Sequence, residues 1–175
     1  HLVDAEMIKL RDIFAEELRE MAQSDLSKST LNSIINAVPE ELLVRSSASG
    51  SLTRALGQMC LKAHRTVGSS GKLSLHVRAM PDGSDAICFI IRGINGKTHD
   101  LVIEKPALVI DNPDDVTLDA YSTYMSATHI ENLGGQYRED FNGDTSVNLI
   151  AIVPADHVQS VGHKIKALPS AANAH

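Results

Sequence analysis

The chain has 175 residues, of which 43% are hydrophobic, and a formal net charge of −6. This length and composition suit one well-packed domain and are short for two. The acidic balance and the low aromatic content, with no Trp, argue against a nucleic-acid-binding surface. Since no apolar run approaches the ~18 residues that a membrane helix needs, we expect no direct membrane contact and a cytoplasmic location.

The first segments predict one helix and two short extended stretches. Leu2 to Ala22 carries apolar residues at helical spacing and charged residues elsewhere, which predicts an amphipathic helix. The run Leu31 to Val38, ended by Pro39, is interpreted as a strand, and Glu41 to Ser47 as a short extension. The next helix is expected to begin near Ser49 to Ser51, because serine is a suitable N-cap.

That second helix has one apolar and one polar stripe. The apolar residues fall three and four apart, so one face can be buried: Leu52, Ala55, Leu56, Met59, Cys60, Ala63 and Val67. The opposite stripe holds Arg54, Gln58, Lys62 and Arg65. The sequence GSSGK at Gly68 to Lys72 lacks residues that a phosphate loop requires, so it predicts a helix stop. Cys60 and Cys88, the second in an apolar strand, are interpreted as core residues of a reducing compartment.

The second half of the chain predicts two hairpins around one helix. Leu73 to Met80 and Ala86 to Ile91 flank the turn PDGSD and form the first hairpin. Two strand-like stretches follow, at Asp100 to Glu104 and at Ala107 to Ile110. We then expect the following elements in order: a helix over TLDAYSTYMSATHIENLGG, a closing hairpin over QYREDFNGDTSVNLIAIVP, and a partly disordered tail over 155–175.

These segments, in this order, resemble the ATP-binding domain of sensor histidine kinases, in the gyrase/Hsp90/histidine kinase/MutL superfamily. The resemblance rests on the helix SLTRALGQMCLKAHRTV, the strand LSLHVRAM, the Gly-Gly-ended helix, and the hairpin with Gly143 and Thr145 in its turn. It covers about Asp12 to Pro154. It implies an α/β two-layer sandwich in which helices cover a mixed sheet.

The resemblance also implies where a nucleotide site would lie. The family's helix carries Asn-x-x-x-Asn, whose second Asn coordinates magnesium, and a basic residue three positions further on. The corresponding residues here are Gln58, Lys62 and Arg65. Because an ammonium cannot ligate a cation, Lys62 is incompatible with that magnesium site.

Two further family elements differ in this sequence. The Asp that reads adenine is replaced by Ile91 or Arg92, depending on register. The phosphate-facing glycines become Leu118, Ala120 and Ser122, and a Leu side chain blocks the approach of backbone amides to phosphate.

No other constellation predicts a metal or catalytic site. None of the eight histidines has a Cys or His neighbour at metal-ligand spacing. The alternating Asp140, Asn142, Asp144 and Ser146 suggest a calcium loop, but Thr145 and Ala151 stand where Gly and Glu are required. We therefore expect a hairpin turn there.

The sequence thus predicts a non-catalytic signalling module, a pseudo-ATPase domain with no ATP, other cofactor or metal. Its vacated pocket is expected to be lined by Gln58, Lys62, Arg65 and Arg92. One alternative is a histidine phosphotransferase whose phosphoacceptor His lies upstream of this chain. A third is an active sensor histidine kinase domain with atypical nucleotide binding.

Such a module would act through a protein partner, such as a response regulator or a kinase, or through a homodimer. We expect residues 1–22 to continue an upstream dimerisation helix, with 23–154 forming the ATPase-like domain. The basic pocket could attract an acidic partner surface, or its side chains could form a solvated helix face. The competing interface is the apolar face of the first helix, Val3, Met7, Leu10 and Phe14, and the next is the edge near Leu101 to Ile110.

Overall fold

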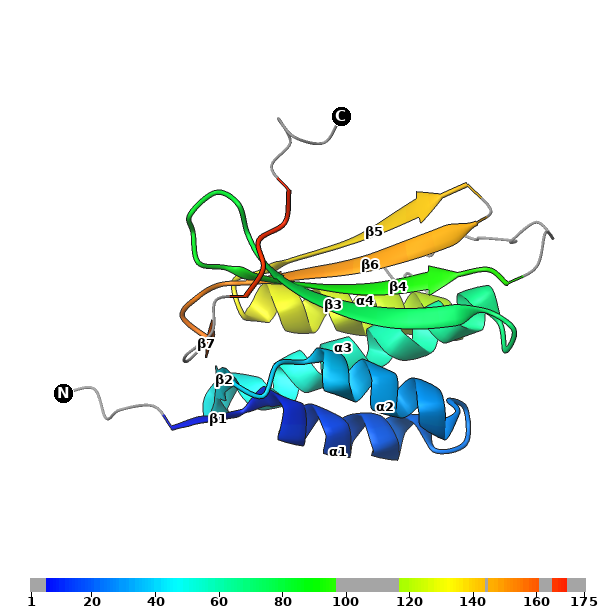
Figure 1. The fold of residues 1–175 in the computed structure, drawn as a ribbon, viewed down its shortest axis with the longest axis horizontal. Helices are drawn as coiled ribbons and strands as arrows, with labels where there is room; N and C mark the ends of the chain where they lie inside the picture. Colours follow the sequence, from blue (N-terminus) through cyan, green and yellow to red (C-terminus); the bar gives the residue numbers. More distant parts are fainter. Residues whose placement is uncertain (1–5, 97–116, 144, 161–164, 170–175) are drawn as a thin grey trace.

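The computed structural model describes residues 6–96, 117–143, 145–160 and 165–169 (Figure 1). One four-stranded sheet has the order β3-β4-β6-β5, and a small sheet has the order β1-β2-β7. The strands are β1 (Met7–Lys9), β2 (Leu42–Arg45), β3 (Lys72–Ala79), β4 (Ile87–Ile94), β5 (Gln136–Asn142), β6 (Ser146–Val153) and β7 (Val158–Ser160). The helices are α1 (Leu10–Ala22), α2 (Lys28–Ala37), α3 (Ser46–Val67) and α4 (Leu118–Asn132).

The helices cover one face of the four-stranded sheet, which confirms the predicted α/β sandwich. Helices α2, α3 and α4 contact β3, β4 and β5 respectively, and α1 packs on α2 and α3 from below (Figure 1). The named strands pair antiparallel throughout, where a mixed sheet was expected. Hairpins join β3 to β4 and β5 to β6, and the central pair, β4 with β6, is antiparallel as well. One parallel bridge, between Ala79 and Ala167, adds to β3 outside the named strands.

The predicted apolar stripe of α3 is confirmed as the centre of the core. Its seven residues are all buried, and they contact the inward-facing side chains of β4 and β6, among them Phe89, Ile91 and Leu149. Gly68 ends the helix with a φ of 74°, a backbone conformation that glycine adopts without strain. Both cysteines are free and buried, and burial raises the pKa of the Cys60 thiol to about 12.

The N-terminal helix is shorter than predicted and belongs to the same core. It begins at Leu10, because Met7–Lys9 forms β1 and pairs antiparallel with β2. Leu10, Phe14 and Leu18 are fully buried against the rest of the domain. Leu10 and Phe14, two of the side chains proposed to continue a helical dimer, are therefore occupied within the chain. Val3 lies outside the described residues.

The stretch predicted as a strand over 31–38 is a helix. Its residues Leu31, Ile34, Ile35 and Val38 fit the helical three-and-four spacing as well as they fit a short apolar strand. The Ser27 side chain caps α2 by accepting a hydrogen bond from the Thr30 amide at 3.1 Å. The burial of Ile34 and Ile35 then fixes the helix on β3.

The two hairpins and the helix between them are confirmed, although α3 begins three residues before Ser49, at Ser46. Within 155–175, β7 pairs with β2 and residues 165–169 reach β3. The strand-like stretches at 100–104 and 107–110 lie outside the described residues. Among the described helices, none has the length and apolar character needed to cross a bilayer.

Candidate functional site

The polar stripe of α3 faces α4 and β5. Lys62 is only 2% exposed, and its Nζ donates to both carboxylate oxygens of Glu139, at 2.7 and 2.6 Å. It also donates to Oγ1 of Thr123 on α4. Because α3 and α4 lie side by side beneath the sheet (Figure 1), one ammonium joins two helices and a strand.

Glu139 receives two more hydrogen bonds. The hydroxyls of Thr123 and Tyr137 donate to its Oε2 at 2.9 and 2.6 Å. Burial, followed by the charge of Glu139, raises the pKa of Tyr137, which keeps this phenol a neutral donor. The Glu139 carboxylate therefore accepts from one cation and two hydroxyl groups. A buried ion pair is stable only when additional hydrogen bonds of this kind satisfy its remaining lone pairs.

A second network joins α3 to the first turns of α4. Arg65 Nε donates to Asp119 Oδ1 at 2.9 Å, and its Nη2 donates to Ser122 Oγ at 2.6 Å. The Ser122 hydroxyl in turn donates to Gln58 Oε1 at 2.9 Å. Gln58, Lys62 and Arg65 thus lie on the same side of α3, and each is bonded to another part of the same chain.

The start of α4 is also occupied. The Thr117 side chain caps the helix by accepting a hydrogen bond from the Ala120 amide at 3.1 Å. Ser122 is buried in the Arg65 network, and the Leu118 carbonyl accepts from Arg65 at 3.4 Å. Of the three positions at which the resemblance expects glycine, Ala120 thus has its amide capped and Ser122 has its side chain buried.

Arg92 does not join the other three residues. Ile91 points inward and is fully buried, so Arg92, the next residue of β4, lies on the outer face of the sheet. A side chain at Gly93 would place its Cβ 2.9 Å from a Val67 methyl carbon, so this inner position is filled as well. The structure therefore divides the predicted pocket between two faces of the sheet.

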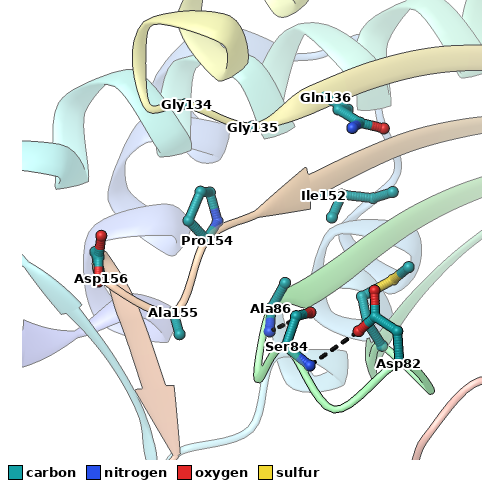
Figure 2. Close-up of a pocket in the computed structure, with 11 residues that line it drawn as sticks. Asp82, Ser84, Ala86, Gly134, Gly135, Gln136, Ile152, Pro154, Ala155 and Asp156 are labelled. Atoms are coloured by element: carbon teal, nitrogen blue, oxygen red, sulfur yellow. Dashed lines mark hydrogen bonds between the residues drawn. The ribbon is translucent and has the colours of Figure 1, made fainter.

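A cavity of about 460 Å³ lies elsewhere, at the end of the sheet where β4 and β5 begin (Figure 2). Three segments line it: the β3–β4 turn with Asp82 and Ser84, the Gly134–Gly135 turn, and Pro154 to Asp156. Asp82 accepts a hydrogen bond from the Ser84 amide at 2.9 Å, and its hydrogen bonds with Ser84 lower its pKa. Among the described residues, no group of three or more His, Cys, Asp or Glu side chains could hold a metal ion.

Comparison with known proteins places this geometry in a known fold. No protein-family model and no curated protein sequence matches the chain. The nucleotide-free catalytic domain of histidine kinase ThkA matches with a TM-score of 0.55 at 14% identity, over 87% of this chain and 97% of that one. The mycobacterial sensor histidine kinase MprB matches with a TM-score of 0.52 at 11% identity, over 85% and 97%.

The histidine kinase domain of the Erythrobacter litoralis blue-light-activated kinase EL346 matches with a TM-score of 0.55 at 13% identity, over 89% of this chain and 70% of that one. In a longer EL346 structure the match spans 42% of the kinase chain. The protein therefore has the fold of a histidine-kinase ATPase domain, as the sequence resemblance predicted.

The sequence missed Glu139 and Thr123 as the partners of Lys62. They lie 77 and 61 residues from Lys62 in the chain. A signal for Glu139 existed, because β5 alternates half-buried and exposed positions and Glu139 shares the inward parity of Tyr137 and Phe141.

Proposed function

We propose that this chain is a non-catalytic signalling module of a two-component-type system, a pseudo-ATPase domain that does not bind ATP and acts through protein contacts. The observation that carries the proposal is the buried ion pair between Lys62 and Glu139. Lys62 stands where the resemblance expects a magnesium-ligating Asn, and its charge is already balanced within the protein. Bringing Mg²⁺ there would require breaking the pair and would place two cations together.

The start of α4 supports the same proposal. Nucleotide phosphates bind where free backbone amides at a helix start face them. Here the Ala120 amide is capped by Thr117, and Arg65, a cation that could otherwise meet a phosphate, is paired with Asp119. Both features favour a domain whose output is contact with a protein, such as a response regulator or a kinase.

A restoration experiment tests this proposal. The variant Gln58→Asn with Lys62→Asn restores the family's Asn pair, and adding Glu139→Gln avoids leaving a buried carboxylate without its cation. Circular dichroism first checks that the variant folds. We expect neither ATP binding nor autophosphorylation of the intact protein with radiolabelled ATP, because the start of α4 stays closed.

Two outcomes would contradict the proposal. Magnesium-dependent ATP binding by the folded variant would show that the α4 contacts do not exclude nucleotide. Phosphoryl transfer between a response regulator and a histidine upstream of this chain would move the assignment to a histidine phosphotransferase.

A further inference from the structure

The outer face of the four-stranded sheet, which none of the described helices covers (Figure 1), carries a shallow cationic groove. The groove has a volume of about 260 Å³. Residues of β3, β4 and β6 and one residue near the C-terminus line it: His76, Arg78, Ile90, Arg92, Asn148, Ile150 and Leu168. We call this set the outer groove.

The described residues supply no counter-charge to the arginines of the outer groove. Within the described part of the chain, neither Arg78 nor Arg92 forms an ion pair with a carboxylate, and Arg78 donates only to the Val77 carbonyl, at 2.9 Å. Arg138 lies on the same face, on β5, but it is paired with Asp140 at 3.2 Å. Among the residues that the structure describes, the groove's arginines are thus without a paired carboxylate, on a protein whose net charge is −6.

His76 lies in the same positively charged region as the two arginines. Its Nε2 lies 3.0 Å from Ser74 Oγ in a hydrogen bond. Burial, followed by the charges of Arg78 and Arg92, lowers the pKa of His76. All three side chains therefore act on one small region of the sheet surface, where an anion would be stabilised.

The strand register fits this region to an extended peptide. His76 and Arg78 lie two residues apart on β3, and Arg92 on β4 is level with Ser74, two residues before His76. The three side chains therefore follow one another at alternate positions in the direction of β3. At roughly 3.4 Å per residue, the two arginines are about 14 Å apart along the strand. Alternate side chains of an extended segment repeat at about 6.8 Å, so acidic residues four positions apart would meet both arginines.

The floor of the groove distinguishes an acidic polypeptide from a nucleic acid. Ile90 and Ile150 pair across β4 and β6 and offer an apolar surface between the charges. Single-stranded nucleic acids bind where cations alternate with large aromatic stacking platforms, and none of the lining residues is Phe, Tyr or Trp. A peptide with an apolar side chain between two carboxylates therefore matches Ile90, Ile150 and the flanking arginines better than a nucleic acid does.

We propose that the outer groove binds an acidic, extended segment of a partner protein, with carboxylates on Arg78 and Arg92 and an apolar side chain over Ile90 and Ile150. This assignment rests on the proposed function, since it names the surface through which the domain would contact its partner. It also replaces the basic pocket expected on α3, because Lys62 and Arg65 are already paired.

A peptide titration tests the assignment. The probe is a fluorescently labelled peptide containing Glu-Ser-Leu-Ser-Glu, with Gln-Ser-Leu-Ser-Gln as the neutral control, followed by fluorescence anisotropy. We expect the acidic peptide to bind more tightly at about 0.01 M salt than at about 1 M salt, where the Debye length falls from about 30 Å to about 3 Å. Arg78→Glu with Arg92→Glu should weaken binding at least about tenfold, and Arg92→Gln should weaken it partly.

A matched control separates the groove from net charge. Arg19→Glu with Lys28→Glu makes the same change in charge at exposed positions of α1 and α2, and it should leave binding within about twofold. Four results would each overturn the assignment. Both double variants could lose affinity equally, or the neutral peptide could bind as tightly as the acidic one. Single-stranded DNA could bind more tightly than the acidic peptide, or the acidic peptide could fail to bind at millimolar concentration. Magnesium–ATP titration of the same samples reports separately on the proposed function, so the two ideas can fail independently.

Discussion

Replacing Lys62 by Met probes the contact that closes the predicted nucleotide site. Met keeps an unbranched chain of similar length but removes the ammonium, so Glu139, which is 12% exposed, would lose its counter-charge and keep only its two hydroxyl donors. Breaking one side of a buried ion pair costs about 3–5 kcal/mol. Set against the 5–15 kcal/mol that stabilises a typical domain, this is a large loss. At about 2–4 °C per kcal/mol, the melting temperature should fall by roughly 6–20 °C.

The pair itself is measured by a double-mutant cycle. Glu139→Gln keeps an acceptor for Tyr137 and Thr123, and by itself it leaves Lys62 without a counter-charge. Since the double variant contains neither charge, its loss of unfolding free energy should be about 2–3 kcal/mol smaller than the sum of the single losses. Urea unfolding followed by far-ultraviolet circular dichroism is suitable, because the chain has no Trp.

Lys72→Met is the matched control, because Lys72 is exposed on β3 and its loss should change stability by no more than about 0.5 kcal/mol. If Lys62→Met proves equally harmless, Lys62 is not held in the interior by Glu139, and the reasoning that the site is closed fails.

Two further predictions concern packing and pH. A Cβ at Gly57 would lie 2.5 Å from Sδ of Met21, the far end of a flexible, half-buried side chain that can turn aside. Because Ala favours a helix interior over Gly by about 0.5–1 kcal/mol, Gly57→Ala should change the free energy of unfolding in urea by less than about 1 kcal/mol, and a loss above about 2 kcal/mol would contradict this reasoning. Burial, followed by the charge of Arg54, lowers the pKa of His129 below its usual 6.5, so protonation favours the unfolded chain. Stability should therefore decrease as pH falls below about 6.5, and His129→Gln should make that decrease shallower; an unchanged pH slope would contradict the assignment.

The sequence predicted the fold well where one signal dominated. The stripe from Leu52 to Val67 has a single helical period, and both hairpins have strong turn signals, so these elements were found. The stretch 31–38 was wrongly predicted as a strand because a short apolar run fits a strand or a helix, and in the structure the Ser27 side chain caps a helix there. The short strand β7 was missed because three residues carry no periodicity and are held by pairing with β2.

The site was harder to predict because its contacts are long-range. Gln58, Lys62 and Arg65 share a helix face by spacing alone, so their proximity followed from the sequence. Their neutralisation by Glu139 and Asp119 depends on how β5 and α4 pack on α3, which spacing within one helix does not encode. The sequence did not determine which face of the sheet carries Arg92, because a shift of one residue on a strand exchanges the inner and outer faces.

The most direct test of the central claim is a calorimetric titration of the unaltered chain with ATP and with ADP, each at millimolar concentration in the presence of magnesium. Because Lys62 is paired with Glu139 and the start of α4 is occupied by Thr117 and Arg65, we predict no binding heat beyond dilution for either nucleotide. A magnesium-dependent dissociation constant in the micromolar range would contradict the account.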